Sequence, residues 1–128
     1  PSAAEPPPDL DPSGEQSWEL AADLGRRYSR VAGDRNPIHM YAWTARLFGF
    51  ERAIIHGMWL LARSVVELGE SVPRQDVRLE ASFRRPVFLP GTAVFRSAEG
   101  QDGAGVQFQL RHPETDKLHL HGWVGSRG

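Results

Sequence analysis

The apolar segment at residues 54–68 limits what this chain of 128 residues can fold into. We expect one helix there, beginning at Ile54 or Ile55 and ending at Leu68, because Gly69 is a natural helix stop. Apolar side chains cover most of its circumference, and such a helix is usually central and buried. They are Met58, Trp59, Leu60, Leu61, Ala62, Val65, Val66 and Leu68.

After Gln75 the sequence changes to the period-two pattern of β-strands. Residues 77–83 alternate between apolar and polar side chains, as a half-buried strand does. Further strands are expected at 92–97, 106–110 and 117–124, with turns at 99–105 and 112–116. The pattern predicts an α+β fold in which an antiparallel meander wraps one long helix. A sheet of few strands that covers one helix leaves apolar surface exposed. We therefore expect pairing with a second copy or a sister domain.

Shorter elements are expected before the long helix. Residues 18–20 alternate like a short strand, and residues 24–32 have helical periodicity, with Asp23 as N-cap and Gly33 as stop. Leu24, Tyr28 and Val31 would form the buried face of that helix. A turn at 34–38 would precede a second short helix at 40–47.

Composition indicates one globular domain. Apolar residues make up 40% of the chain and charged residues 24%, and the net charge is −1, so no field of one sign points to nucleic acid. No apolar run reaches the roughly 18 residues of a membrane span, and no signal peptide is visible. The chain has no cysteine, which fits a reducing compartment, so we expect a cytoplasmic protein.

The chain divides into two parts by composition. Residues 1–16 hold five prolines, which is typical of an extended tail or an interdomain linker. The folded domain is expected at residues 17–128. A linker at the start would be the junction with a preceding domain.

Asp34 and His39 are the first candidates for chemistry. They lie five residues apart with Pro37 between them, and a turn at this proline would bring the carboxylate and the imidazole together. Such a pair could hold one water and move its protons near pH 7, with Asn36 bracing either the turn or the water. On spacing alone, a turn carboxylate and a buried structural histidine are the preferred interpretation, because pairs of polar residues in turns are common.

His56 and Gly57 are the second candidate pair, at the start of the long helix. The Gly57 N–H would be an unpaired donor at the positive end of the helix dipole. Because glycine lacks a side chain, an acyl group can approach this donor and place a carbonyl oxygen on it. The alternative is a glycine that allows close helix–sheet packing.

Other polar residues have simpler interpretations. His119 and His121 share a strand face, where two surface or interface histidines are preferred over a zinc site that lacks a third ligand. The pairs Arg26–Arg27 and Arg84–Arg85 are interpreted as solvated. For the Ser64 hydroxyl, a hydrogen bond back to the carbonyl of residue 60 is preferred over one to a ligand.

Three ordered blocks resemble a known family. The segment YSRVAGDRNPIH at 28–39 resembles the hydratase-2 signature of the MaoC-like (R)-specific enoyl-thioester hydratases, which have the hot-dog fold. IHGM at 55–58 and FRRPVFLPG at 83–91 resemble its later blocks. The resemblance implies a hot-dog domain that adds water reversibly and syn to trans-2-enoyl thioesters, giving (3R)-hydroxyacyl thioesters.

The resemblance also implies roles for residues. Asp34 and His39 would be the catalytic dyad, Gly57 the oxyanion-hole donor, and Asn36 and His56 supporting residues. Candidates for the substrate pocket are Trp59, Ser64, Phe83 and Phe88. The reaction needs no metal or redox cofactor. The substrate would be an acyl-CoA or acyl-carrier-protein thioester, and the assembly a homodimer or a pair with a second hot-dog unit.

Two other functions fit the same resemblance. A non-catalytic subunit would bind acyl thioesters without turnover, and a hot-dog thioesterase would hydrolyse the carbonyl carbon instead of hydrating C3. Release of free thiol distinguishes hydrolysis from hydration.

Overall fold

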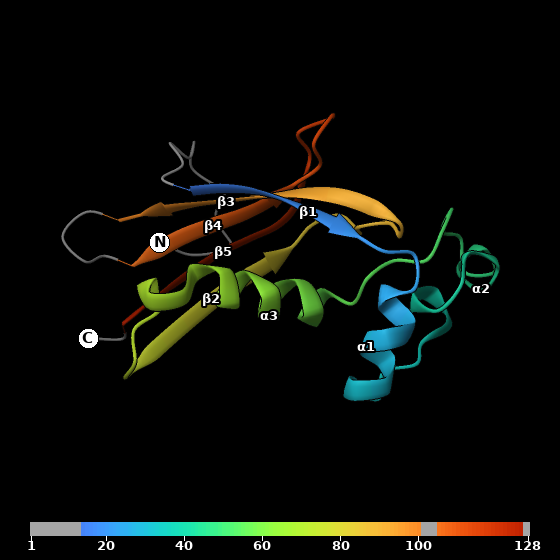
Figure 1. Ribbon diagram of the computed structural model, residues 1–128, viewed down its shortest axis with the longest axis horizontal. Helices are drawn as coiled ribbons and strands as arrows, with labels where there is room; N and C mark the ends of the chain where they lie inside the picture. The colour runs from blue at the N-terminus through green and yellow to red at the C-terminus, as the bar shows by residue number, and fades with distance from the viewer. Residues whose placement is uncertain (1–13, 101–104, 127–128) are drawn as a thin grey trace.

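A computed structural model describes residues 14–100 and 105–126 and contains one antiparallel sheet with a helix across it (Figure 1). The strands are β1 (Gly14–Leu20), β2 (Val77–Phe83), β3 (Gly91–Glu99), β4 (Val106–Arg111) and β5 (Leu118–Ser126). The α-helices are α1 (Leu24–Ala32), α2 (Ala42–Arg46) and α3 (Gly57–Leu68), and two 3-10 turns are η1 (Pro37–His39) and η2 (Gly69–Ser71). The expected α+β class is confirmed.

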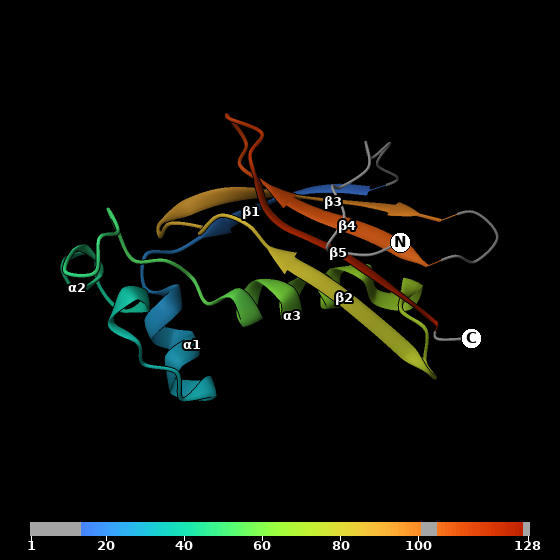
Figure 2. The ribbon, with the colours of Figure 1, turned by 180° about the vertical axis from the view of Figure 1, so that it is seen from behind.

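The sheet has the strand order β1-β3-β4-β5-β2 (Figure 2). β3, β4 and β5 form the expected meander, but β2 pairs with β5, from Val77 opposite Ser126 to Phe83 opposite Leu120. The prediction of a continuous meander is therefore wrong at β2. The seven residues at 84–90 are longer than a hairpin loop and include Pro86 and Pro90, and they carry the chain across the sheet to β3, which lies between β1 and β4.

β1 begins earlier than the sequence pattern predicts. Gly14 pairs with Ser97 and Leu20 with Gly91, so residues 14–16 of the expected tail belong to a strand. The rest of the proline-rich segment lies outside the described residues. Polar side chains on an edge strand hide its alternation, because only Trp18 and Leu20 of β1 are buried.

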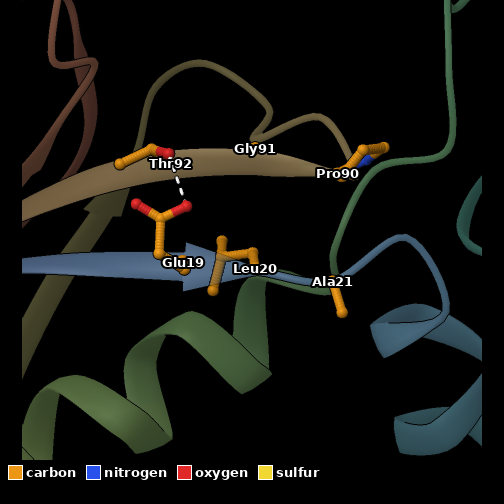
Figure 3. A pocket seen from close by; sticks show the side chains of 6 residues that line it. All are labelled: Glu19, Leu20, Ala21, Pro90, Gly91 and Thr92. Carbon is orange, nitrogen blue, oxygen red and sulfur yellow. Dashed lines mark hydrogen bonds between the residues drawn. The ribbon is translucent and has the colours of Figure 1, made fainter.

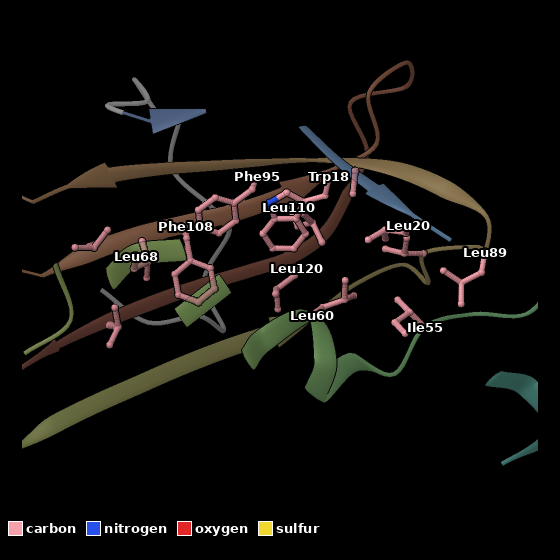
Figure 4. Packing of buried hydrophobic residues seen from close by; sticks show 14 residues of the cluster. Trp18, Leu20, Ile55, Leu60, Leu68, Leu89, Phe95, Phe108, Leu110 and Leu120 are labelled. Carbon is pink, nitrogen blue, oxygen red and sulfur yellow. The ribbon is translucent and has the colours of Figure 1, made fainter. Parts of the chain in front are cut away.

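The core lies between the sheet and α3 (Figure 4). Trp18 and Phe95 stack there with ring centroids 5.1 Å apart, and Leu60 and Leu68 pack against the sheet from α3. Burial of each such side chain stabilises the fold by about 1.5–3 kcal/mol. This packing fixes the axis of α3 and, with it, the position of its N-terminus.

α3 differs from the expected helix in two ways. It begins at Gly57, because Ile54 and Ile55 are extended: Ile54 bridges to Phe88, and the Ile55 N–H donates to the Val87 carbonyl at 3.0 Å. Only one of its faces is buried, so the prediction of a helix enclosed all round is wrong for this chain alone. Met58 and Val66 are 61% and 75% exposed, although Gly69 ends the helix as expected.

α1 ends at Gly33, which adopts φ 80° in the left-handed region that favours glycine. Asp23 occupies the N-cap position as expected, but its side chain makes no capping hydrogen bond and pairs with Arg27 at 3.3 Å instead. The buried face is also different: Val31 is 87% exposed, whereas Gly25 and Ser29 are buried. The bare Cα of Gly25 lets α1 pack directly on the backbone of η1.

The segment expected as one helix at 40–47 is shorter. η1 precedes it, and α2 covers Ala42–Arg46. Among residues 14–100 and 105–126, no helix is both long and apolar enough to cross a lipid bilayer.

Candidate active site

A cleft of about 360 Å³ lies where the C-terminus of α1, η1 and the N-terminus of α3 meet. It brings together four residues that the sequence singled out, from segments on both sides of α2. The lining residues are Tyr28, Ala32, Asp34, His39, His56, Gly57 and Met58.

The turn at residues 34–39 holds Asp34 and His39 in a fixed relation. One Asp34 oxygen, Oδ1, accepts the Asn36 N–H at 3.1 Å, and Asn36 Oδ1 caps η1 by accepting the Ile38 N–H at 3.3 Å. Pro37 begins η1, where its missing N–H costs nothing. Of the two roles considered for Asn36, these contacts correspond to bracing the turn.

The Asp34 carboxylate and the His39 imidazole lie close to each other in the cleft. Because a carbonyl can only accept, the 2.8 Å contact between His39 Nδ1 and the Ile54 carbonyl places a hydrogen on Nδ1. The Nε2 lone pair of His39 then lies 4.0 Å from Asp34 Oδ2. This is too long for a direct hydrogen bond, but a water about 2.8 Å from both atoms would bond them at an angle of about 90°.

Burial controls the charge of His39. Desolvation lowers the pKa of this imidazole below 6.5, and the neighbouring His56 lowers the pKa further. The hydrogen bond to Ile54 and the charge of Asp34 oppose this shift. His39 is therefore neutral near pH 7, with Nε2 free to accept a proton.

His56 is held by residues of α1 and by the turn. Its Nε2 lies 2.9 Å from the Asp34 carbonyl and 3.4 Å from Ser29 Oγ, so Nε2 carries the hydrogen. Its ring stacks on His39 with centroids 3.7 Å apart, and the Tyr28 ring meets it edge-on at 4.8 Å.

Asp34, His39 and His56 offer ligand atoms within 4.8 Å of one another, which is close enough to consider a metal ion. The hydrogen-bond pattern argues against this reading. Nε2 of His56 is a donor to the Asp34 carbonyl, so it has no lone pair for a cation. We assign no metal to this group.

Gly57 is the first residue of α3 and lines the same cleft. Within the described part of the chain, no acceptor for its N–H is found, so this donor is open at the positive end of the helix. The Phe83 ring lies against Gly57, with Cε1 3.0 Å from the position that a Cβ would take. A larger residue here would have to displace that ring.

Three predicted pocket residues lie elsewhere. Trp59 packs edge-on against Trp18 beside the core. Ser64 is fully buried and donates to the Leu60 carbonyl at 2.7 Å, the bond that the sequence favours. It is seven residues after Gly57, about 10 Å along the helix axis. Phe88 bridges to Ile54 and lies under Arg52. Of the four candidates, Phe83 is the one whose ring lies against Gly57, at the cleft.

Tyr28 and Ser29 belong to the site, although sequence reasoning gave them no role there. Tyr28 and Ala32 line the cleft from positions four apart on α1, a spacing visible in the sequence. Ser29 Oγ donates to the Gly25 carbonyl at 2.8 Å, which leaves its lone pair for His56. The burial of Ser29 could not be predicted from the sequence, because serine is a polar residue that is usually exposed.

The other polar candidates differ from their simple interpretations. His119 and His121 are buried, so the reading as surface histidines is wrong for the single chain. Within residues 14–100 and 105–126, neither belongs to a cluster of three or more potential metal ligands. Arg26 donates to the Met40 carbonyl at 2.6 Å and covers the Tyr41 ring, so it is structural.

A second depression lies at the end of β1 and β3 (Figure 3). Its carboxylate, Glu19, accepts a hydrogen bond from Thr92 Oγ1 at 3.0 Å. The other lining residues are Leu20, Ala21, Pro90 and Gly91, so the depression offers no acid–base pair. We assign no chemistry to it.

Buried histidines make the stability of the protein depend on pH. Burial lowers the pKa values of His39 and His119 below 6.5, so the unfolded chain binds more protons than the folded chain once the pH falls below 6.5. Their contribution to stability is full above pH 6.5 and falls as the pH decreases toward the folded-state pKa. We expect a lower Tm at pH 5.5 than at pH 7.5 in thermal denaturation followed by circular dichroism.

The His119→Asn variant is the control for this pH effect, because asparagine can keep the bond that His119 Nδ1 makes to the Arg85 carbonyl. The Tm difference between the two pH values should shrink in this variant. An unchanged difference would contradict a contribution from His119.

The helix across a five-stranded antiparallel sheet, with a cleft that contains Asp34 and two histidines at the helix N-terminus, defines a hot-dog-fold domain. Residues 3–121 match the family model described as MaoC like domain. The chain therefore belongs to the MaoC-like domain family, as the three sequence blocks predict.

Relatives agree with this assignment. The 3-hydroxyacyl-thioester dehydratase X of Mycobacterium tuberculosis is 44% identical over 95 residues, covering 74% of this chain and 33% of that protein. Dehydratase Y of the same organism is 36% identical over 121 residues, covering 80% and 41%. The crystal structure of HtdX from M. tuberculosis has a TM-score of 0.78 at 35% identity, covering 88% of this chain and 46% of that one. The chain thus spans less than half the length of each.

Proposed function

We propose that this chain catalyses the reversible syn addition of water to trans-2-enoyl thioesters, giving (3R)-hydroxyacyl thioesters. The observation that carries the proposal is the 4.0 Å separation of His39 Nε2 and Asp34 Oδ2 in the cleft that also contains the open Gly57 N–H. The relatives named as 3-hydroxyacyl-thioester dehydratases support the reaction class.

The mechanism divides the work between the dyad and the helix terminus. The Gly57 N–H binds the thioester oxygen and stabilises the charge that develops there, which makes C3 electrophilic. A water between Asp34 and His39 adds its oxygen to C3 while the dyad takes one of its protons. The π electrons move toward the carbonyl, and the dyad returns a proton to C2 from the same side. Because one group of atoms serves both carbons, the addition is syn.

The thioester would be carried by coenzyme A or by an acyl-carrier protein. The cleft receives the reacting carbons, and the Phe83 ring beside Gly57 would border the bound acyl group. The cytoplasm remains the proposed location.

We propose further that the domain pairs with a second hot-dog unit, either a copy of itself or a sister domain. Support comes from the apolar side chains that α3 and β2 leave uncovered: Met58, Val66, Val77, Leu79 and Phe83 are each 41–75% exposed. Light scattering of the purified chain should give a mass of two copies of the 14.3 kDa chain. A monomeric mass at micromolar concentration would overturn the homodimer.

The experiment that tests the function follows the loss of enoyl absorbance with enoyl-CoA substrates from short to long chains. Hydration with a (3R)-hydroxyacyl product supports the proposal. Release of free thiol would replace it with a thioesterase, and binding of acyl-CoA without turnover would replace it with an acyl-binding subunit.

A further inference from the structure

His56 lies directly before α3 but makes no side-chain hydrogen bond to the first turn of its own helix. Instead its Nε2–H reaches the Asp34 carbonyl, 22 residues earlier in the chain. The side chain is 3% exposed, so this bond is shielded from competing water. A buried imidazole that ties two parts of the cleft together calls for a specific role.

The bond to His56 completes the support of Asp34. The carboxylate is 56% exposed and would otherwise rotate freely in solvent. Its Oδ1 is engaged by the Asn36 N–H, and its backbone is held through the carbonyl by His56. Oδ2 remains as the oxygen aimed at the cleft, 4.0 Å from Nε2 of both histidines.

The ring of His56 supports the other half of the dyad. It stacks on the His39 ring with an interplanar angle of 23°, and the His39 Nδ1–H is anchored to the Ile54 carbonyl. Anchor and stack together fix both the position and the plane of the His39 ring. Tyr28 and Ser29 of α1 in turn hold His56. The Tyr28 ring contacts the His56 ring edge-on, and Ser29 Oγ lies 3.4 Å from His56 Nε2.

We propose that His56 is the positioning residue of the dyad: its Nε2–H fixes the Asp34 backbone, and its ring fixes and shields the His39 ring. The inference rests on the proposed hydratase function. His56 exchanges no proton with the substrate. It sets the distance between the carboxylate and the imidazole that hold the water.

Two variants separate the two contributions. His56→Phe keeps an aromatic ring against His39 but removes the donor to Asp34, so kcat should fall about tenfold with KM within about twofold, because the water is misplaced. His56→Gln can keep a donor at the position of Nε2 but removes the stacked ring. At high pH this variant should lose less of kcat than His56→Phe, because the Ile54 carbonyl still anchors the His39 ring after the stack is removed.

The ring's role has its own readout. The titratable groups that face His39 are Asp34 from the turn and His56 from the start of α3, and Tyr28 from α1 faces His56. Removing the His56 ring relieves the desolvation and the repulsion that lower the pKa of His39. In His56→Gln the pKa of His39 should rise, and the acid limb of the kcat–pH profile should move to higher pH. His112→Gln, at the turn between β4 and β5, is the matched control and should change neither.

A double-mutant comparison distinguishes positioning from general damage. If His56 acts through Asp34, His56→Phe should cost little more in an Asp34→Asn background. An equal loss in both backgrounds, or wild-type kcat in His56→Phe, would overturn the role of the donor. An NMR titration of His39 that is unchanged in His56→Gln would overturn the role of the ring.

Failure of the proposed role of His56 can be distinguished from failure of the proposed function. A wild-type chain that hydrates no enoyl thioester overturns the function itself. The NMR titration needs no substrate, so it tests the shielding of His39 in either case.

Discussion

Asp34→Asn is expected to lower kcat for enoyl-thioester hydration by about 10²- to 10⁴-fold, the usual worth of a positioned acid–base group. The amide has nearly the same shape and can still accept the Asn36 N–H through its carbonyl oxygen. It cannot take a proton from water. Because the Asp34 side chain is 56% exposed, the fold should persist, as judged by circular dichroism.

His39→Asn should have a loss of the same size. Asparagine can place an N–H where His39 Nδ1 donates to the Ile54 carbonyl, so the buried bond is retained while the Nε2 base is removed. Loss of enoyl absorbance measures both variants. Asp23→Asn removes a carboxylate that pairs with Arg27 outside the cleft, and it should turn over like wild type. Unaffected hydration in Asp34→Asn and His39→Asn would show that the dyad is assigned wrongly.

The turn that carries Asp34 and His39 could be predicted, because the residues that form it lie next to one another in the sequence. Gly33 supplies the left-handed conformation that ends α1, and Asn36 and Pro37 start η1, so the sequence itself folds Asp34 toward His39. The Gly57 N–H is open for an equally local reason, since first-turn donors have no partner within a helix.

The distant contacts of the site could not be predicted. The bond from His56 to Asp34 and the contact from Ser29 to His56 depend on how α1 packs, and no periodicity encodes that packing. Similarly, apolar character marks Val31 and Val66 as core, yet both are exposed in the single chain. A hydrophobic pattern identifies surfaces that avoid water but does not say whether this chain or another covers them.

The strand order does not follow from the sequence pattern, for a topological reason. β2 has the alternation of any half-buried strand, and nothing in it records whether β3 or β5 is its neighbour. The proline-containing connection at 84–90 was the available signal, because a segment of that length is not a tight hairpin.

Gly25→Ala is the second substitution with a large expected effect, although alanine is ordinarily the better helix residue by about 1 kcal/mol. A Cβ at Gly25 would overlap the backbone carbonyl oxygen of His39, and a backbone group cannot rotate away as a side chain can. Overpacking of this kind costs about 1–3 kcal/mol, and here α1 or η1 must move as a whole. We expect a net destabilisation of about 1–2 kcal/mol, measured by urea unfolding.

The same movement of α1 or η1 should also lower kcat. η1 carries His39, whose Nε2 must stay 4.0 Å from Asp34 Oδ2 for both to hold one water. A shift of about 1 Å can lower kcat about a hundredfold, so the folded fraction of Gly25→Ala should turn over poorly. Val31→Ala is the control, because it introduces alanine on the exposed face of the same helix. That variant should keep both its unfolding midpoint and its kcat. A Gly25→Ala protein that is more stable than wild type and fully active would show that close packing of α1 on η1 does not hold the dyad in place.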